Sequence, residues 1–181
     1  MKVEIEIPEG KKAEWVNGVL TLVDKKPQDI TDHIKTFDDA VNALGNEHPL
    51  VSQCYRAIAA FKYNPMAENL IAYTKLRVIC AALNEGWKPI LDGGKYRYYV
   101  WFYIYTKEEY EKLGEEEKAY CAPLRSNNNA SAGGGLVYAY ASVAGSYSYS
   151  NGGVRLSLKT RELAEYCAKQ FIGIWCDYLF G

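Results

Sequence analysis

The sequence predicts an α+β fold: an N-terminal β-hairpin, helices, an antiparallel sheet late in the chain and a C-terminal helix. Apolar residues recur at three- and four-residue spacing through residues 36–86, which indicates helices. The aromatic and β-branched run of residues 95–106 indicates a central strand, and a second helical pattern ends the chain. We therefore expect a small β unit over residues 1–26 and an α+β domain over residues 27–181.

The N-terminal unit has two strand signals. Residues 2–7 alternate apolar and acidic side chains, which is typical of a short strand. In "EWVNGVLTLV", two β-prone runs are joined by Asn17 and Gly18, a pair that favours a tight hairpin turn. The polar stretch "DKKPQD" then predicts a linker into helical sequence.

The expected helices carry recognisable start and stop signals. Thr36 with Asp39 resembles a capping box, and Gly45 ends that short helix. Pro49 begins a second helix, and Pro65 ends it and opens the longest one. The apolar stripe of this longest helix is expected to contain Leu70, Tyr73, Leu76, Ile79, Cys80 and Leu83.

The late sheet is built in our prediction from residues 95–106 and from two further runs, "GLVYAYASV" and "VRLSLKT". The charged stretch "KEEYEKLGEEEKAYCAP" between them is expected to be a short helix or a loop. Thr160 is a natural N-cap for a final helix of about twenty residues that packs across the sheet. Its apolar face would contain Leu163, Cys167, Phe171, Ile174, Trp175 and Tyr178.

Composition excludes several classes of function. The net charge is −1, with 21 basic and 22 acidic residues, which argues against binding to nucleic acid or to an anionic membrane. The apolar runs fall short of the ~20 residues that span a bilayer, and "MKVEIEIPEG" does not resemble a secretory signal, so we expect a cytoplasmic protein without membrane insertion. The five cysteines follow no metal-binding spacing and are predicted to be reduced core residues.

No catalytic motif is found in the sequence. His33 and His48 stand in separate contexts and are expected to be surface or capping residues. Residues 133–135 are three glycines before a strand rather than after one, which predicts a turn and not a phosphate site. Glu115, Glu116 and Glu117 are expected to form a solvated face. The sequence therefore predicts no enzyme activity, no cofactor and no metal, with a small enzyme of unrecognised site as an alternative.

Residues 126–154 contain seven residue types and no charge. At the 24% charged content of the chain, about seven charged side chains would be expected in a stretch of this length. Burial on both faces would explain their absence. So would a restricted codon supply, because all seven types are reached by replacing the adenines of an asparagine codon, as diversity-generating retroelements do.

Three interpretations of residues 126–154 are open. The segment could be a low-complexity loop, or ordinary sheet and turn with a chance bias. Its Tyr, Ser, Gly and Asn content is also typical of recognition loops, in which rigid aromatic rings are combined with adaptable hydrogen-bonding groups.

The segment "GLVYAYASV…SYSYSNGGVRLSLKT" resembles the C-terminal portion of a family of phage and prophage proteins of gut bacteria, and more loosely the end of C-type-lectin-like domains. "IEIPEG", "LNEGWKP" and "RELAEYCAKQF" are similar to signatures of the same phage family. The calcium-binding Glu-Pro-Asn type motif of sugar-binding lectins is missing, so no calcium is expected. The resemblance implies a ligand-binding surface formed by Asn127, Asn128, Asn129, Tyr138, Tyr140, Ser142, Tyr147, Tyr149 and Asn151.

We therefore expect a non-enzymatic recognition protein of phage or prophage origin, whose surface is open to diversification. Its partner would be a protein or glycan ligand on a cell surface. The alternative is a structural virion accessory protein that uses the same segment to contact neighbouring virion subunits, since small uncharged residues suit a subunit contact. The sequence leaves the oligomeric state open.

Overall fold

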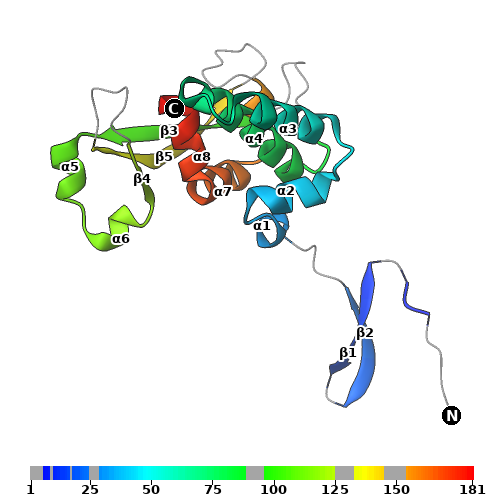
Figure 1. Ribbon diagram of the computed structural model, residues 1–181. Helices are drawn as coiled ribbons and strands as arrows, with labels where there is room; N and C mark the ends of the chain where they lie inside the picture. The colour runs from blue at the N-terminus through cyan, green and yellow to red at the C-terminus, as the bar shows by residue number, and fades with distance from the viewer. Residues whose placement is uncertain are drawn as a thin grey trace.

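The computed structural model describes residues 6–8, 10–16, 18–24, 29–88, 96–124, 133–144 and 154–181 (Figure 1). Helices and two antiparallel sheets make up this part of the chain, which confirms the predicted α+β class. In Figure 1 the N-terminal hairpin stands apart from a body in which the helices gather around one side of the second sheet. No helix in the described ranges is long and apolar enough to cross a membrane.

The N-terminal sheet is the predicted hairpin. Strands β1 (Lys11–Val16) and β2 (Val19–Asp24) pair antiparallel, with Val16 opposite Val19. Gly18 has a φ of +80°, a conformation that side-chain-bearing residues rarely adopt, which explains a glycine in this turn. Asn17 lies outside the described residues. Of the strand predicted over residues 2–7, only Glu6 and Ile7 are described, and neither is assigned to a strand.

The second and third helices begin where the sequence predicts, and a short first helix, which was not predicted separately, precedes them. They are α1 (Ile30–His33), α2 (Phe37–Leu44) and α3 (Pro49–Phe61). The capping box at the start of α2 is confirmed: the Asp39 amide donates to Thr36 Oγ1 at 3.1 Å, and the Thr36 amide donates to Asp39 Oδ2 at 2.8 Å. His48 caps α3, because its Nδ1 accepts from the Leu50 amide at 3.2 Å.

Helix α4 (Glu68–Leu83), preceded by the 3₁₀ turn η1 (Pro65–Ala67), lies at the centre of the core. It packs against α2, α3 and the C-terminal helix α8, so it is surrounded on several sides. Leu76, Ile79, Cys80 and Leu83 of the predicted stripe are buried, whereas Leu70 near the start of the helix is exposed. All five cysteines of the chain are free and buried, as predicted.

The second sheet has three antiparallel strands in the order β3-β5-β4. Strands β3 (Arg97–Tyr105) and β5 (Gly135–Ala144) form the predicted pair. Between them along the chain come the short helices α5 (Lys107–Glu111) and α6 (Glu115–Lys118) and then strand β4 (Cys121–Pro123). Strand β4 was not predicted. A three-residue strand has too little pattern to detect, and as an edge strand it tolerates Pro123.

The strand predicted from "VRLSLKT" is wrong. Residues Val154–Leu156 form the 3₁₀ turn η2, and only Leu158 makes a bridge, with Tyr98 of β3. The cause is Asn84 at the end of α4, whose Nδ2 donates to the Ser157 carbonyl at 2.9 Å and whose Oδ1 accepts from the Lys159 amide at 3.0 Å. Because these backbone groups bond to a side chain, they do not extend the ladder.

The single C-terminal helix that we predicted is two helices, α7 (Arg161–Gln170) and α8 (Ile172–Phe180). Thr160 caps α7 as predicted, since its Oγ1 accepts from the Leu163 amide at 3.2 Å. The chain bends at Phe171, with φ −111° and ψ 27°. This bend lets α7 cover β3 and β5 while α8 turns towards β4 and α4.

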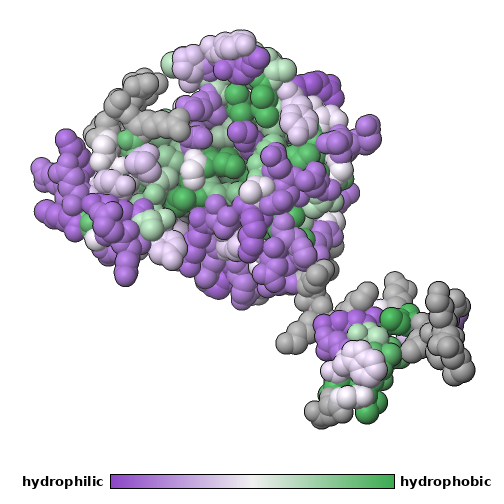
Figure 2. All heavy atoms as spheres, turned by 60° about the horizontal axis from the view of Figure 1, so that its bottom comes forward, coloured by the Kyte–Doolittle hydropathy of each residue, from purple (hydrophilic) through white to green (hydrophobic). Residues whose placement is uncertain are grey.

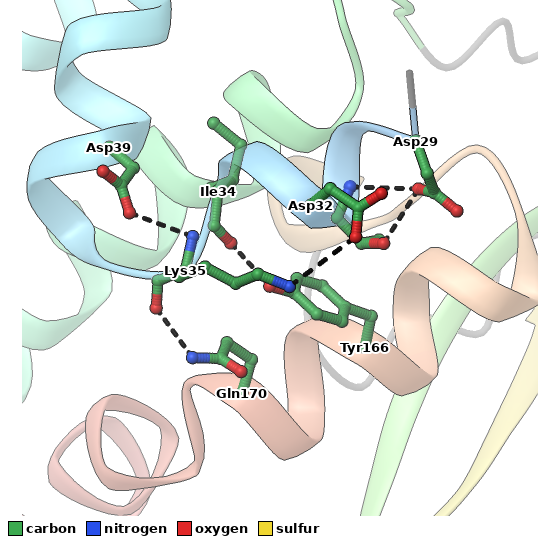
Figure 3. Close-up of polar contacts among 8 residues, drawn as sticks. Asp29, Asp32, Ile34, Lys35, Asp39, Tyr166 and Gln170 are labelled. Atoms are coloured by element: carbon green, nitrogen blue, oxygen red, sulfur yellow. Dashed lines mark hydrogen bonds and ion pairs between the residues drawn. The ribbon is translucent and has the colours of Figure 1, made fainter. Parts of the chain in front are cut away.

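Helix α7 also anchors the start of the body. The Tyr166 hydroxyl donates to the Ile34 carbonyl and Gln170 Nε2 donates to the Lys35 carbonyl, both at 2.7 Å (Figure 3). Burial raises the pKa of the Tyr166 hydroxyl, so it remains a donor well above neutral pH. These bonds place α1, and with it the point where the hairpin joins the body, against the helix that covers the sheet.

Candidate functional site

Within the described part of the chain, the second sheet has one face packed by helices and one face that is largely uncovered, which we call the open face. Side chains alternate along β3: Tyr98, Val100 and Phe102 pack on the core beneath α7 and α8. The Phe102 ring lies 5.5 Å from the ring of Trp175 in α8. By the same alternation Ile104 belongs to the packed side at the exposed end of the strand, and the opposite, open face carries Arg97, Tyr99, Trp101, Tyr103 and Tyr105.

A β-bulge in β5 decides which of its tyrosines reach the open face. Trp101 pairs with Tyr140 and Phe102 pairs with Tyr138, so Ala139 is an extra residue on β5. In a regular strand Tyr138 and Tyr140 would share a face. Because of the bulge, Tyr140 lies beside Trp101 on the open face and Tyr138 lies on the helix face.

The open face displays stacked aromatic rings. The rings of Trp101 and Tyr140 are 5.9 Å apart and inclined by 14°, and the two residues are 38% and 48% exposed. Tyr103, two residues along β3, is 59% exposed. We call Trp101, Tyr103 and Tyr140 the open-face cluster. Ser142, which is half-buried and follows Tyr140 on the same face, adds a hydroxyl group beside it.

Arg97 lies at one end of the open face and is 1% exposed. Its Nε donates to the Tyr99 hydroxyl at 2.6 Å. Nη1 and Nη2 are buried and have no hydrogen-bond partner within the described part of the chain. A buried guanidinium has lost its hydration, so an acceptor brought to these two nitrogens would be bound by a charge-assisted pair of hydrogen bonds.

The opposite end of the open face is closed by an aromatic ring from α5. Gly135, the first residue of β5, lies under the Tyr110 ring so closely that an added Cβ would come within 2.5 Å of it. A glycine is needed here because the ring occupies the space of a side chain. The open-face cluster thus lies between Tyr110 and Arg97.

Tyr138 has a different environment from Tyr140. Lys169 of α7 places its Nζ 5.0 Å from the centre of the Tyr138 ring. Burial, followed by the negative charge of Glu165, raises the pKa of the Tyr138 hydroxyl. The two tyrosines that the sequence offered as equivalent contacts therefore belong to opposite faces of the sheet.

The other predicted contacts lie outside the described residues. They are Asn127, Asn128, Asn129, Tyr147, Tyr149 and Asn151. In the sequence they stand shortly before and after β5, which carries Tyr140 and Ser142. Sequence reasoning missed Trp101, Tyr103 and Arg97 because we read residues 95–106 only as a central strand. The signal that could have found them is the aromatic residue at successive odd positions of that run.

The described residues hold no group of three or more His, Cys, Asp or Glu side chains that could bind a metal ion. Glu115, Glu116 and Glu117 form the solvent-exposed helix α6, and His48 is engaged as a cap. The arrangement of the open face is suited to binding by ring faces and hydroxyl groups.

The fold and the site together define an α+β domain with an open aromatic sheet face. No protein-family model, curated protein or solved structure matches the chain.

Proposed function

We propose that this protein is a non-enzymatic recognition protein that binds a cell-surface ligand on the open-face cluster. The observation that carries the proposal is the stacked, exposed pair of Trp101 and Tyr140. Large exposed aromatic groups are costly in a monomer in water, and patches of them mark interaction sites. These two rings are held by a sheet whose other face is packed, so little conformational entropy is lost when they bind.

The ligand chemistry follows from the residues on this face. The open-face cluster offers flat apolar rings, and Tyr103, Tyr140 and Ser142 add hydroxyl groups. Tyrosine and tryptophan are the commonest anchors of recognition surfaces for this combination of area and polarity. Tyr147, Tyr149 and Asn151 follow β5 in the sequence and would extend the same chemistry. The phage and prophage resemblance supports a ligand on a bacterial surface, either a glycan or a protein.

The proposal is tested by the binding of fluorescently labelled protein to a panel of fixed gut-bacterial strains. We expect the double substitution Trp101→Ala and Tyr140→Ala to weaken binding at least tenfold, because anchor residues of this kind contribute about 2 kcal/mol or more. Tyr63→Ala is the matched control, since Tyr63 is 86% exposed and follows α3, away from the sheet. Equal binding by the three proteins would refute the proposal.

Pretreatment of the same cells identifies the ligand. Periodate destroys glycans, whereas protease digestion removes surface proteins. Loss of binding after only one treatment assigns the ligand to that class.

The second candidate is a virion accessory protein that buries the open-face cluster against a neighbouring subunit. The exposed apolar rings support it, because obligate subunit contacts are also rich in aromatic residues. It predicts that the same double substitution abolishes self-association of the purified protein. Recognition would be favoured if substitution of Trp101 and Tyr140 weakened cell binding but left the self-association of the protein unchanged.

A further inference from the structure

The three described strands of the second sheet contain one charged residue, Arg97. Other charged side chains of the body are exposed away from these strands. Asp32 of α1 and Lys35 after it are examples, and Figure 2 shows mainly hydrophilic atoms on the part of the body next to the hairpin. On the open face, Arg97 therefore stands as one positive charge among the neutral side chains of β3 and β5.

The Arg97 guanidinium is held in place but its charge is not balanced. Its Nε donates to the Tyr99 hydroxyl at 2.6 Å, and its Cζ lies 6.0 Å from the centre of the Tyr99 ring. Nη1 and Nη2 are buried and have no hydrogen-bond partner among the described residues. Because Nε is occupied, the end of the guanidinium that remains offers two parallel N–H bonds, which match the two oxygens of a carboxylate.

Arg97 lies on the same face as the open-face cluster and within reach of it. Trp101 follows four residues later on β3, which is about 13 Å at the rise of a β-strand. Tyr140 is opposite Trp101, and Ser142 is opposite Tyr99, between the two ends. A ligand that lies along β3 therefore meets aromatic rings first, then hydroxyl groups, and then a cation.

We propose that the ligand of the open-face cluster is an acidic glycan whose carboxylate binds Nη1 and Nη2 of Arg97. This inference rests on the proposed function and names the class of ligand. The C–H groups of a sugar ring pack on the negatively polarised faces of aromatic rings, and its hydroxyl groups bond to Tyr103, Tyr140 and Ser142. One carboxylate balances one guanidinium, so the complex contains no uncompensated buried charge.

Binding at Arg97 requires a rearrangement of side chains. Arg97 is 1% exposed, so the carboxylate displaces the groups that cover the guanidinium. Tyr99 is half-buried on the open face and is bonded to Arg97 by one hydrogen bond, so it is the side chain that we expect to move. Side-chain rotations are fast compared with the lifetime of a complex. Once the pair has formed, its burial strengthens it, because charges attract more strongly away from water.

Carboxyl reduction of the glycan tests the proposal on the unmodified full chain. The probe is surface polysaccharide extracted from a strain that the protein binds, used as extracted and after its carboxyl groups have been reduced to alcohols. By isothermal titration calorimetry, we expect the wild type to bind the reduced form about 10- to 100-fold more weakly, because a charged hydrogen-bonded pair is lost. Equal affinity for the two forms overturns the proposal, and so does cell binding that only protease treatment removes.

The substitution Arg97→Met tests whether this residue recognises the carboxylate. The variant loses an uncompensated buried charge, so it is expected to fold. We expect it to bind both forms of the polysaccharide equally, with the affinity of the wild type for the reduced form. Arg56→Met is the matched control, because it makes the same change of net charge at an exposed residue of α3 and is expected to bind like the wild type. An Arg97→Met variant that still prefers the unreduced form overturns the proposal.

The proposed function and this inference fail in different ways. Binding that does not depend on Trp101 and Tyr140 refutes the proposed function. Binding that depends on these two residues but is the same before and after carboxyl reduction refutes the carboxylate subsite alone.

Discussion

Arg97 is a buried cation that has, among the described residues, one side-chain hydrogen-bond partner, the neutral Tyr99 hydroxyl. Its Nε is bonded to Tyr99, while Nη1 and Nη2 have no partner in the described ranges. Removing a guanidinium from water is costly, and one hydrogen bond to a neutral hydroxyl offsets only part of that cost. Arg97 is therefore a residue that stability alone does not favour at its position.

This reasoning leads to a prediction for stability. Arg97→Met keeps the length of the side chain and removes the buried charge, so the free energy of unfolding is expected to stay equal or to rise by about 1 kcal/mol. Tyr99→Phe leaves the charge buried with no partner and is expected to lower it by about 1–2 kcal/mol. Urea unfolding of both variants measures these changes. A loss above about 2 kcal/mol for Arg97→Met would show that the guanidinium stabilises the fold.

At the scale of elements, two glycines are predicted to respond oppositely to the same substitution. Gly135→Ala brings a methyl group against the Tyr110 ring and is expected to destabilise the sheet by about 1–3 kcal/mol. Gly173→Ala in α8 meets nothing within 4 Å and is expected to stabilise by about 0.5–1 kcal/mol. Thermal unfolding of the two variants compares them directly. If both substitutions changed the stability in the same direction, the result would contradict the packing of α5 on β5.

The start of α2 gives a prediction about pH. Hydrogen bonding from the Thr36 side chain, and then from the Thr36 amide, holds the pKa of the Asp39 carboxyl below its usual value. A lowered folded-state pKa contributes stability that is complete above the unfolded value of about 4 and is lost as the pH falls towards the folded value. Thr36→Ala removes the side-chain part of this contribution, together with the bond that the Asp39 amide donates to Thr36 Oγ1, and is expected to lower Tm by about 2–4 °C at pH 6.

The measurement is Tm at pH 6 and at pH 3 for the wild type and for Thr36→Ala. The difference between the two proteins is expected to shrink at pH 3, because part of the stabilising contribution of the Asp39 carboxylate is lost once the pH falls below the unfolded pKa of about 4. A difference that is equal at both pH values would show that Asp39 does not take part in the cap.

For the whole molecule, the body and the hairpin have different sources of stability. The body buries α4 between helices and closes one face of the β3-β5-β4 sheet with α7 and α8. The hairpin exposes apolar side chains on both faces, among them Trp15 and Val19, and the open-face cluster is exposed on the body. Of these surfaces, the open-face cluster is where a cell-surface ligand is proposed.

The sequence by itself determined the class of fold and most helix starts. The residues that mark these starts act on backbone groups within a few residues of themselves, so the local sequence is enough to predict their effect. They are Thr36, His48, Pro49 and Thr160. The Asn17-Gly18 pair predicted the hairpin for the same reason. For the candidate site, the sequence indicated the aromatic composition around β5 but not the faces of the strands.

Only the tertiary structure decided which side chains meet. Because of the bulge at Ala139, Tyr138 and Tyr140 lie on opposite faces of the sheet. The bulge depends on pairing with β3, which is more than thirty residues away in the chain. The bend at Phe171 and the bonds of Asn84 to residues 157–159 likewise depend on contacts between distant segments. Local backbone preferences do not specify such contacts, because their free energy arises only when the elements pack together.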